Sequence, residues 1–467
     1  MSKKKVTKQL LPELMLQDDK YIKDLIYCTN DNTFYLYQIG WYKALAKKNM
    51  LAEIRYFLMN NERTLHQDLG LGTYKDVFEQ LQLSLIYKNS IEEHFNLDYM
   101  ALKDSMFNFK TLQVEDIDNK DRKFTPFHLN FNASELQIDI TTSFRNLKEI
   151  APCFCKFLET SIVFKENKDE TDYETIEVIQ EMLGYYLTGT MKKTVAFFLI
   201  GNGANGKTVL SDIIRCMFPK EYVTANTLEE LTTDGTRIAS LIGKKLNIAA
   251  EDESKNLKND KFKAFVSGDL IQTRRLYEES FSYTPTCKFL FITNQPPKFK
   301  SVDNGIKRRV VIINFAKDFK EEDQDRDLTE KIRKEMAVIV GWAINGAKRF
   351  IKNNYVFTST VATKQAKMSF ISDMSSGLSF MNENYEYIQC KGSNGTKGTD
   401  LYIEYQKWVE EVGKKPLGRD TFYDHLDRNH YKGYKYRRLQ YFQVIKKSNL
   451  YHEADASEDI DLDDITF

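Results

Sequence analysis

The feature that most constrains the fold is an eight-residue glycine-rich motif, Gly201-Asn202-Gly203-Ala204-Asn205-Gly206-Lys207-Thr208. It satisfies the phosphate-loop pattern, in which backbone N–H groups close on phosphates and the following helix points its positive end at them. A run of strand-forming residues, Thr194 to Ile200, precedes the motif, and a helical pattern from Lys207 to Met217 follows it. This context favours a nucleotide-binding loop over a chance glycine-rich turn.

Three further runs of strand-forming residues come later in the chain, separated by stretches with helical periodicity: Lys245 to Ala250, Lys288 to Thr293 and Val310 to Phe315. Strands that alternate with helices predict an α/β fold with a mostly parallel sheet. Lys331 to Phe350 has an apolar face at helical spacing and is expected to pack under that sheet.

Polar side chains follow two of these strands. Glu251-Asp252-Glu253 ends one, and Asn294 ends another. At the carboxyl edge of a parallel sheet, carboxylates can orient Mg²⁺ and polarise water, and an amide can touch the γ-phosphate of ATP. Lys207 is then expected at the β and γ oxygens, and Thr208 at Mg²⁺. Acids after a strand can also form no more than a solvated turn.

Two basic segments lie between the later strand runs. Lys307-Arg308-Arg309 stands immediately before the strand run from Val310, where an arginine can reach the ATP site of a neighbouring subunit. The alternative is a surface basic cluster. Residues 267–283 predict a hairpin or loop insertion whose basic and aromatic side chains could contact a sugar-phosphate backbone.

These motifs occur in a fixed order: GNGANGKT, AAEDE, SGDLIQTRRLYEESFSY, FLFITNQPP and GIKRRVVIINF. In that order they resemble the motifs of superfamily 3 helicases, above all the poxvirus and phage or plasmid primase-helicase family. Upstream, CKFLETSIVF and IEVIQEMLGYYLTG are similar to the segment that precedes the ATPase in that family, as are LYIEYQKWVEEVG and TFYDHL downstream. The resemblance covers residues from about 105 to 445.

The resemblance implies roles for particular residues. It makes Lys207 and Thr208 the Walker A pair, Glu251 and Asp252 the Walker B acids, with Thr208 and both acids at the metal, and it leaves open which acid serves as base. Asn294 becomes the sensor. Arg309 becomes the arginine finger, with Arg308 as its rival.

It further implies an AAA+ core that forms a homo-hexameric ring, uses ATP and Mg²⁺, and translocates 3′ to 5′ on single-stranded DNA. In that family a hairpin between the acidic and sensor motifs touches DNA, and here Lys263, Arg274, Arg275 and Tyr277 occupy that region.

The C-terminal part is strongly polarised in charge, although the whole chain balances 67 basic against 67 acidic residues. Between Lys414 and Lys447 ten Lys or Arg face three Asp, a local charge of +7. Two helical stretches and two short strand-like runs in this part predict a winged helix-turn-helix. The cations expected on DNA are Arg419, Lys435, Arg437 and Arg438.

Seven acids between Glu453 and Asp464 then form an acidic tail, which could compete with DNA for the basic module, solubilise the chain or dock a partner protein. The expected organisation is an N-terminal domain (1–125), a helical collar (126–190), the ATPase core (191–350), a linker with a helix (351–390), the winged helix (391–450) and the tail (451–467).

Residues 1–120 lack a convincing primase domain, so a separate primase or polymerase is an expected partner. The layout resembles replication initiator helicases of phage satellites and staphylococcal-type pathogenicity islands, in which the winged helix is expected to recognise duplex DNA at an origin.

The longest apolar run, Val195 to Ile200, is far shorter than the ~20 residues of a membrane span. With six scattered cysteines and no signal peptide at the start, we expect a soluble cytoplasmic chain without membrane contacts. Small buried thiols are favoured over a zinc site at Cys153 and Cys155.

Two functions from different classes follow. The first is a ring helicase that separates DNA strands at the expense of ATP. The second is an origin-binding or regulatory ATP switch that assembles on DNA without unwinding it. A small-molecule kinase would leave the basic C-terminal module without a role.

Overall fold

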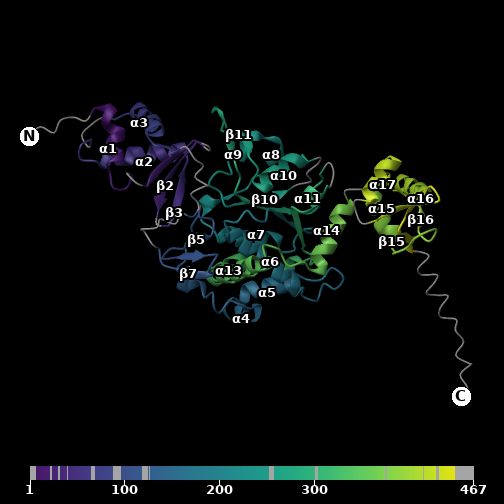
Figure 1. Cartoon of the computed structure of the whole chain (residues 1–467). Helices are drawn as coiled ribbons and strands as arrows, with labels where there is room; N and C mark the ends of the chain where they lie inside the picture. The colour runs from purple at the N-terminus through teal and green to yellow at the C-terminus, as the bar shows by residue number, and fades with distance from the viewer. Residues whose placement is uncertain are drawn as a thin grey trace, which may run out of the picture. The chain divides into compact units, whose positions relative to one another are not determined.

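The computed structural model describes residues 7–21, 24–29, 32–38, 40–64, 69–87, 96–117, 125, 127–251, 257–299, 303–373, 376–413, 415–427 and 431–447. The chain divides into two compact units, residues 1–298 with 308–364 and residues 299–307 with 365–467 (Figure 1). Among the helices of these described ranges, none is long and apolar enough to cross a membrane. The acidic tail lies outside the described residues.

The first unit begins with a small mixed module, which we call the N-terminal module. Its elements are η1 (Lys8–Leu10), α1 (Leu11–Leu16), β1 (Leu25–Cys28), β2 (Thr33–Gln38), β3 (Trp41–Leu45), α2 (Lys47–Asn60), α3 (Leu71–Ser84) and β4 (Ile86–Tyr87). The sheet has the strand order β3-β2-β1-β4. Because successive side chains of a strand point to opposite faces, Leu25, Phe34 and Leu36 share one face, and they pack with α2 and α3 in a hydrophobic core.

A three-stranded antiparallel sheet and three helices lead from this module to the main sheet. They are β5 (Tyr99–Ala101), β6 (Met106–Asn108), β7 (Gln113–Glu115), the short η3 (Ala133–Leu136), α4 (Phe144–Ile150), α5 (Pro152–Ser161) and α6 (Tyr173–Leu187). α6 packs closely along α13 (Met336–Lys352). A Cβ at Gly184 would lie 2.1 Å from the backbone N of Ala347, so the helices can approach this closely only at a glycine.

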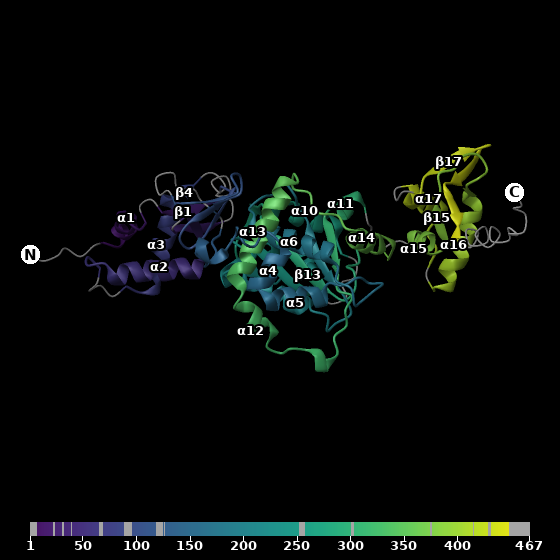
Figure 2. The ribbon, with the colours of Figure 1, turned by 90° about the horizontal axis from the view of Figure 1, so that it is seen from below.

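The main sheet is five-stranded and entirely parallel, which confirms the α/β prediction. It has the order β14-β8-β13-β10-β9, with β8 (Ala196–Ile200), β9 (Val223–Thr224), β10 (Leu246–Glu251), β13 (Lys288–Thr293) and β14 (Val310–Asn314). Side chains of α6, α7 (Lys207–Cys216) and α13 share one hydrophobic core with Phe197 and Leu199 of β8. Figure 2 shows α4, α5, α6 and α13 over this side of the sheet.

The opposite face of the sheet is covered by α10 (Asn259–Ser267), whose Phe265 packs on Phe289 of β13 with ring centroids 4.9 Å apart. The remaining elements of this part are η4 (Lys220–Tyr222), α8 (Leu228–Thr233), α9 (Gly235–Ala239), η5 (Glu321–Asp323) and α12 (Leu328–Arg333). Between α10 and β13 the chain forms an antiparallel hairpin of β11 (Ile271–Arg274) and β12 (Ser280–Tyr283). The predicted hairpin is therefore present.

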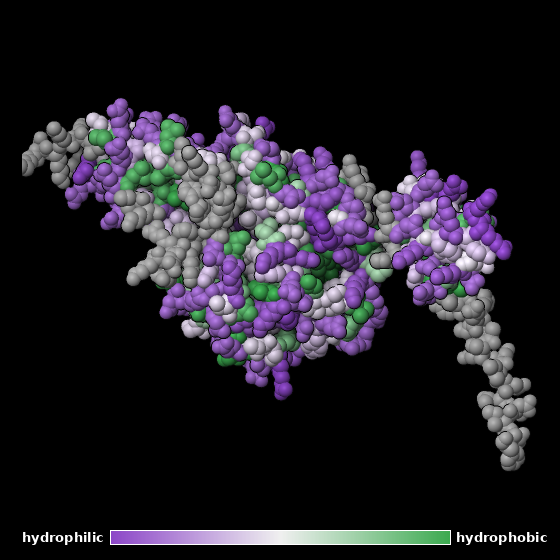
Figure 3. All heavy atoms as spheres, viewed as in Figure 1, coloured by the Kyte–Doolittle hydropathy of each residue, from purple (hydrophilic) through white to green (hydrophobic). Residues whose placement is uncertain are grey.

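The second unit holds α11 (Asn304–Lys307) and most of α14 (Val361–Asp373), followed by a compact α/β arrangement. Its elements are α15 (Ser376–Asn384), β15 (Tyr385–Tyr387), β16 (Thr396–Lys397), α16 (Gly398–Glu411), α17 (Arg419–Asp427), β17 (Gly433–Tyr436), β18 (Leu439–Phe442) and β19 (Val444–Lys446). The small sheet has the order β16-β18-β17, and β15 pairs with β19. The face shown in Figure 3 is predominantly hydrophilic over these elements.

Candidate nucleotide-binding site

The glycine-rich loop joins the end of β8 to the start of α7, as the sequence predicts. Gly206, the residue before the helix, has φ +94°, and the backbone at Gly203 and Ala204 is also left-handed. A Cβ at Gly201 would lie 2.5 Å from the carbonyl oxygen of Phe315, which leaves no room for a larger residue. The loop is thus folded tightly at the N-terminus of a helix, the arrangement that binds phosphate through backbone N–H groups.

Lys207 lies at the base of this loop and is 5% exposed. Its Nζ donates to the Gly201 carbonyl oxygen at 2.6 Å, to Asn205 Oδ1 at 3.0 Å and to Asn294 Oδ1 at 3.4 Å. All three acceptors are neutral, and no ion pair to Lys207 is formed within the described ranges. Burial lowers the pKa of the Lys207 ammonium because the charged form is desolvated. An anion bound at this place would supply a counter-charge to this ammonium.

The strands around the loop end at the same level. Ile200 of β8 is paired with Thr293 of β13 and Asn314 of β14, and Thr293 is paired in turn with Glu251 of β10. The loop, the acidic segment and Asn294 therefore leave the sheet from one edge. In parallel sheets ligands bind outside the carboxyl ends of the strands, at the place where connections to neighbouring strands diverge. Here β9 and β14 are the two outermost strands of the sheet. The chain continues from β8 to β9 on one side and from β13 to β14 on the opposite side.

The predicted metal ligands are only partly described. Thr208 is exposed in the first turn of α7. For Glu251 the backbone position alone is described, and Asp252 with Glu253 lies outside the described residues. In the remainder of the described chain, no group of three His, Cys, Asp or Glu side chains could hold a metal ion. The assignment of Mg²⁺ ligands therefore remains a prediction.

Two long-range contacts, which no local sequence pattern predicts, hold the loop in shape. Asn205 Nδ2 donates to the Phe315 carbonyl oxygen at 3.3 Å, and the Phe319 N–H donates to the Ala204 carbonyl oxygen at 3.0 Å. The segment after β14 thus fastens the phosphate loop from the side. Behind the loop, the fully buried Ser161 hydroxyl of α5 lies 2.7 Å from where a Gly206 Cβ would be.

The two candidate finger arginines differ sharply in environment. Arg309 is 8% exposed, and its Nε donates to Ser267 Oγ at 2.7 Å. Its backbone carbonyl also accepts from the Ala196 N–H at 2.8 Å, which ties it to the start of β8. Arg308, one residue earlier in the same turn, is exposed. Arg308 is thus the one whose side chain is available to a second molecule.

The residues predicted to touch DNA near the hairpin also fall into two groups. Arg274 is exposed at the end of β11, and Tyr277 is fully exposed in the turn with φ +63°. Arg275 instead donates to the N-terminal module, and Lys263 forms an ion pair with Asp260 at 3.2 Å. The structure brings Arg274 and Tyr277 together at the hairpin tip and does not bring Lys263, which belongs to α10, to that tip.

In the second unit, all four cations that the sequence predicts on DNA are exposed. Arg419 opens α17, Lys435 lies in β17, and Arg437 with Arg438 forms the turn between β17 and β18. Both turn residues have left-handed backbone, φ +48° and +67°, a conformation that hairpin turns usually give to Asn or Gly. Left-handed backbone at a residue other than glycine costs about 1–3 kcal/mol.

The chain is similar to one described protein family and to several viral proteins. The family described as "Family of unknown function (DUF5906)" matches residues 199–309, which run from the end of β8 to Arg309. A protein of Acanthamoeba polyphaga mimivirus named as a putative helicase is 29% identical over 175 residues, which is 36% of this chain and 18% of that protein. Primase D5 of Fowlpox virus is 25% identical over 162 residues, 32% of this chain and 20% of that protein.

A putative helicase of Invertebrate iridescent virus 3 is 24% identical over 255 residues, 47% of this chain and 27% of that protein. The chain spans about a fifth to a quarter of the length of these relatives. Two solved structures of the apo NrS-1 C-terminal region are 11% identical, with TM-scores of 0.45 and 0.42 over 93% and 94% of this chain and 98% and 99% of theirs. Over 32% to 47% of its length the chain is thus similar to viral proteins named as helicases and as a primase.

Proposed function

We propose that this chain is an ATP-driven DNA motor: a superfamily 3 helicase with an AAA+ core that initiates replication of a mobile element. The observation that carries the proposal is the arrangement at the carboxyl edge of the sheet. There a buried cation, Lys207, lies 3.4 Å from the amide oxygen of Asn294, beside a loop built to bind phosphate. The viral relatives named as helicases and as a primase support the same direction.

In this mechanism the loop N–H groups and Lys207 hold the β- and γ-phosphates of ATP. Thr208 with Glu251 and Asp252 would hold Mg²⁺, which supplies charge neutralisation on the phosphate oxygens. One of the acids that follow β10 accepts a proton from the attacking water. Asn294 contacts the γ-phosphate or that water and so registers hydrolysis.

The remaining charge of the transition state needs a cation from outside the subunit, which we assign to Arg308 because Arg309 is buried against Ser267. An arginine acting across a subunit interface requires an oligomer, and we propose a homo-hexameric ring. Arg274 and Tyr277 at the hairpin tip then contact single-stranded DNA in the pore, and the ring moves 3′ to 5′.

We further propose that the second unit is a winged helix that binds duplex DNA at an origin. In this assignment α17 is the recognition helix and the β17–β18 hairpin is the wing, whose arginine turn contacts phosphates. A polymerising primase would be a separate protein. The rival proposal, an ATP switch that binds an origin without unwinding, needs the same phosphate loop and the same basic module.

Unwinding of a forked DNA decides between them, with ATP and with a non-hydrolysable analogue in parallel reactions. A helicase unwinds only with ATP, and Lys207→Ala should abolish both turnover and unwinding while leaving duplex binding by the second unit unchanged. Lys220→Ala is the control. It changes an exposed lysine of the first unit, which also contains Lys207, and should behave as wild type. ATP turnover without any unwinding would support the switch, and normal turnover by Lys207→Ala would remove the phosphate-loop assignment.

A further inference from the structure

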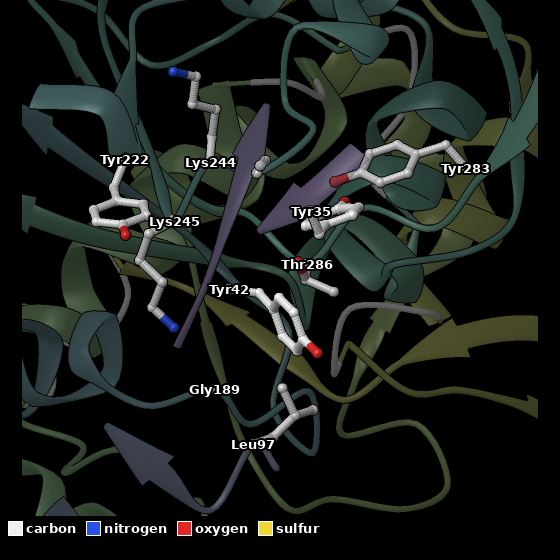
Figure 4. Close-up of a pocket in the computed structure, with 11 residues that line it drawn as sticks. Tyr35, Tyr42, Leu97, Gly189, Tyr222, Lys244, Lys245, Tyr283 and Thr286 are labelled. Atoms are coloured by element: carbon white, nitrogen blue, oxygen red, sulfur yellow. The ribbon is translucent and has the colours of Figure 1, made fainter. Parts of the chain in front are cut away.

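The outer face of the N-terminal sheet is covered by the ATPase core. Tyr35 and Tyr42 lie on this face, opposite the side chains that pack on α2 and α3, and they are only 4% and 5% exposed. They line a cavity together with Tyr222, Tyr283 and Lys245 of the core (Figure 4). At about 30 Å³ this cavity has room for ordered water but not for a nucleotide. It marks a docking contact between the module and the core.

A glycine shows how close this docking is. Gly243, in the turn before β10, has φ +69°, and a Cβ there would lie 2.8 Å from the Cβ of Ala44 in β3. No larger residue fits between the two backbones without moving one of them. The module is therefore seated directly on the turn that leads into β10, within one compact unit.

A second set of contacts joins the module to the β11–β12 hairpin. Arg275, in the hairpin turn, donates from Nη1 to the Asn32 carbonyl oxygen at 3.0 Å and from Nη2 to Thr33 Oγ1 at 2.8 Å. Asn32 Nδ2 donates back to Glu278 Oε2 of the same turn at 3.3 Å. Arg275 also lies 3.6 Å from Glu278 and 5.3 Å from the centre of the Phe281 ring. A guanidinium held by two acceptors in fixed directions is well suited to orient a turn.

The residues on either side of Arg275 are left exposed. Arg274 precedes it, and Leu276 and Tyr277 follow it, with Leu276 71% exposed. The hairpin thus has an inner residue that binds the module and outer residues that face solvent. Of these four consecutive residues, Arg275 binds the module, and the other three are exposed to solvent.

We propose that Arg275 is a positioning residue through which the N-terminal module fixes the orientation of the hairpin, so that Arg274 and Tyr277 meet single-stranded nucleic acid in one geometry. This proposal rests on the proposed function, since it assigns the hairpin to nucleic acid. In this proposal the N-terminal module takes no part in ATP hydrolysis. Its role is to hold the hairpin rigidly, so that ATP hydrolysis moves the bound DNA strand.

The test is ATPase turnover of the full chain against the concentration of single-stranded DNA. Thr33→Val removes the hydroxyl acceptor without changing shape, whereas Thr33→Ser keeps it. We expect Thr33→Val to leave turnover without DNA unchanged and to lower the maximal DNA-stimulated rate by about tenfold, as the loss of a charged hydrogen bond predicts. Thr33→Ser should restore it. Arg274→Ala, in contrast, should raise the DNA concentration for half-maximal stimulation and leave the maximum unchanged.

A double-mutant cycle tests whether Thr33 acts through Arg275. Adding Thr33→Val to Arg275→Ala should cause no further loss, because the shared bond is already gone. The proposal is overturned if DNA stimulates the ATPase rate of Thr33→Val as strongly as that of wild type. It is also overturned if Arg275→Ala changes only the DNA concentration for half-maximal stimulation, as expected of a direct DNA contact. Amide hydrogen exchange over residues 271–283 provides a readout independent of DNA: Thr33→Val should accelerate it. If DNA does not stimulate the ATPase rate of the wild-type protein, the proposed function is refuted. The exchange experiment would still test whether the contact of Arg275 with Thr33 orders the hairpin.

Discussion

Arg308 and Arg309 are adjacent in sequence, but the structure predicts opposite consequences when each is replaced by alanine. Arg308 is exposed in the turn before β14, whereas Arg309 is 8% exposed and donates to Ser267 Oγ at 2.7 Å. The first substitution removes a side chain available to another subunit. The second leaves the half-buried hydroxyl of Ser267 without its charged donor.

The expected magnitudes differ accordingly. Arg308→Ala should change the free energy of unfolding by no more than about 0.5 kcal/mol, as is usual for an exposed position. If Arg308 is the finger, the same substitution should lower turnover by roughly 10³- to 10⁵-fold. Arg309→Ala should lose about 1.5–3 kcal/mol of stability from its charged hydrogen bond. Its effect on turnover should follow from the lost contact between Ser267 of α10 and the turn before β14.

Thermal unfolding and steady-state ATPase assays of both variants separate these effects, and subunit mixing tests action across the interface. Arg308→Ala chains mixed in equal amounts with Lys207→Ala chains should regain activity. In a randomly mixed ring, about a quarter of the interfaces pair an intact loop with an intact arginine. Absence of recovery in rings shown by native mass spectrometry to be mixed would refute the reasoning, as would wild-type turnover by Arg308→Ala.

Two further predictions concern stability. Glu181 is fully buried and accepts from Arg349 Nε at 2.8 Å and from the Thr358 N–H at 2.6 Å, so Glu181→Ala should destabilise the protein by about 1.5–3 kcal/mol in denaturant unfolding because hydrogen bonds to a carboxylate are lost. A loss below about 1 kcal/mol would contradict the role of this carboxylate. Burial lowers the pKa of His128 below its ordinary 6.5, so the unfolded chain binds more protons and stability should fall as the pH drops below about 6.5. His128→Phe should flatten the melting temperature between about pH 5 and 8, and an unchanged slope would show that other groups cause it.

The local elements were predictable because each has a short-range cause. The strand before the loop was expected from Thr194 to Ile200 and runs from Ala196 to Ile200, and the helix after it was expected to end at Met217 and ends at Cys216. Strand-forming residues before a glycine-rich loop and an amphipathic helix behind it leave little choice. The short β9 was missed, since two residues carry no pattern.

The long-range contacts were not predictable. Arg275 was expected on DNA because it is a cation beside aromatic residues, yet its partners Asn32 and Thr33 lie more than two hundred residues away in sequence. No periodicity encodes such a bond. The sequence could not distinguish Arg308 from Arg309 for a similar reason: a turn can expose either side chain, and the long-range contact of Arg309 with Ser267 accompanies the burial of that guanidinium.

β13 has a mechanical consequence of its own. It is paired with β10 along all six residues and with β8 from Phe289 to Thr293, so neighbouring strands hold it on both sides. Its six residues span about 20 Å. Asn294 follows one end of the strand, and four residues separate the other end from β12 of the hairpin. Under the proposed function, a displacement at Asn294 would therefore reach the hairpin only with the whole sheet, because the ladders to β8 and β10 leave β13 no sliding movement of its own.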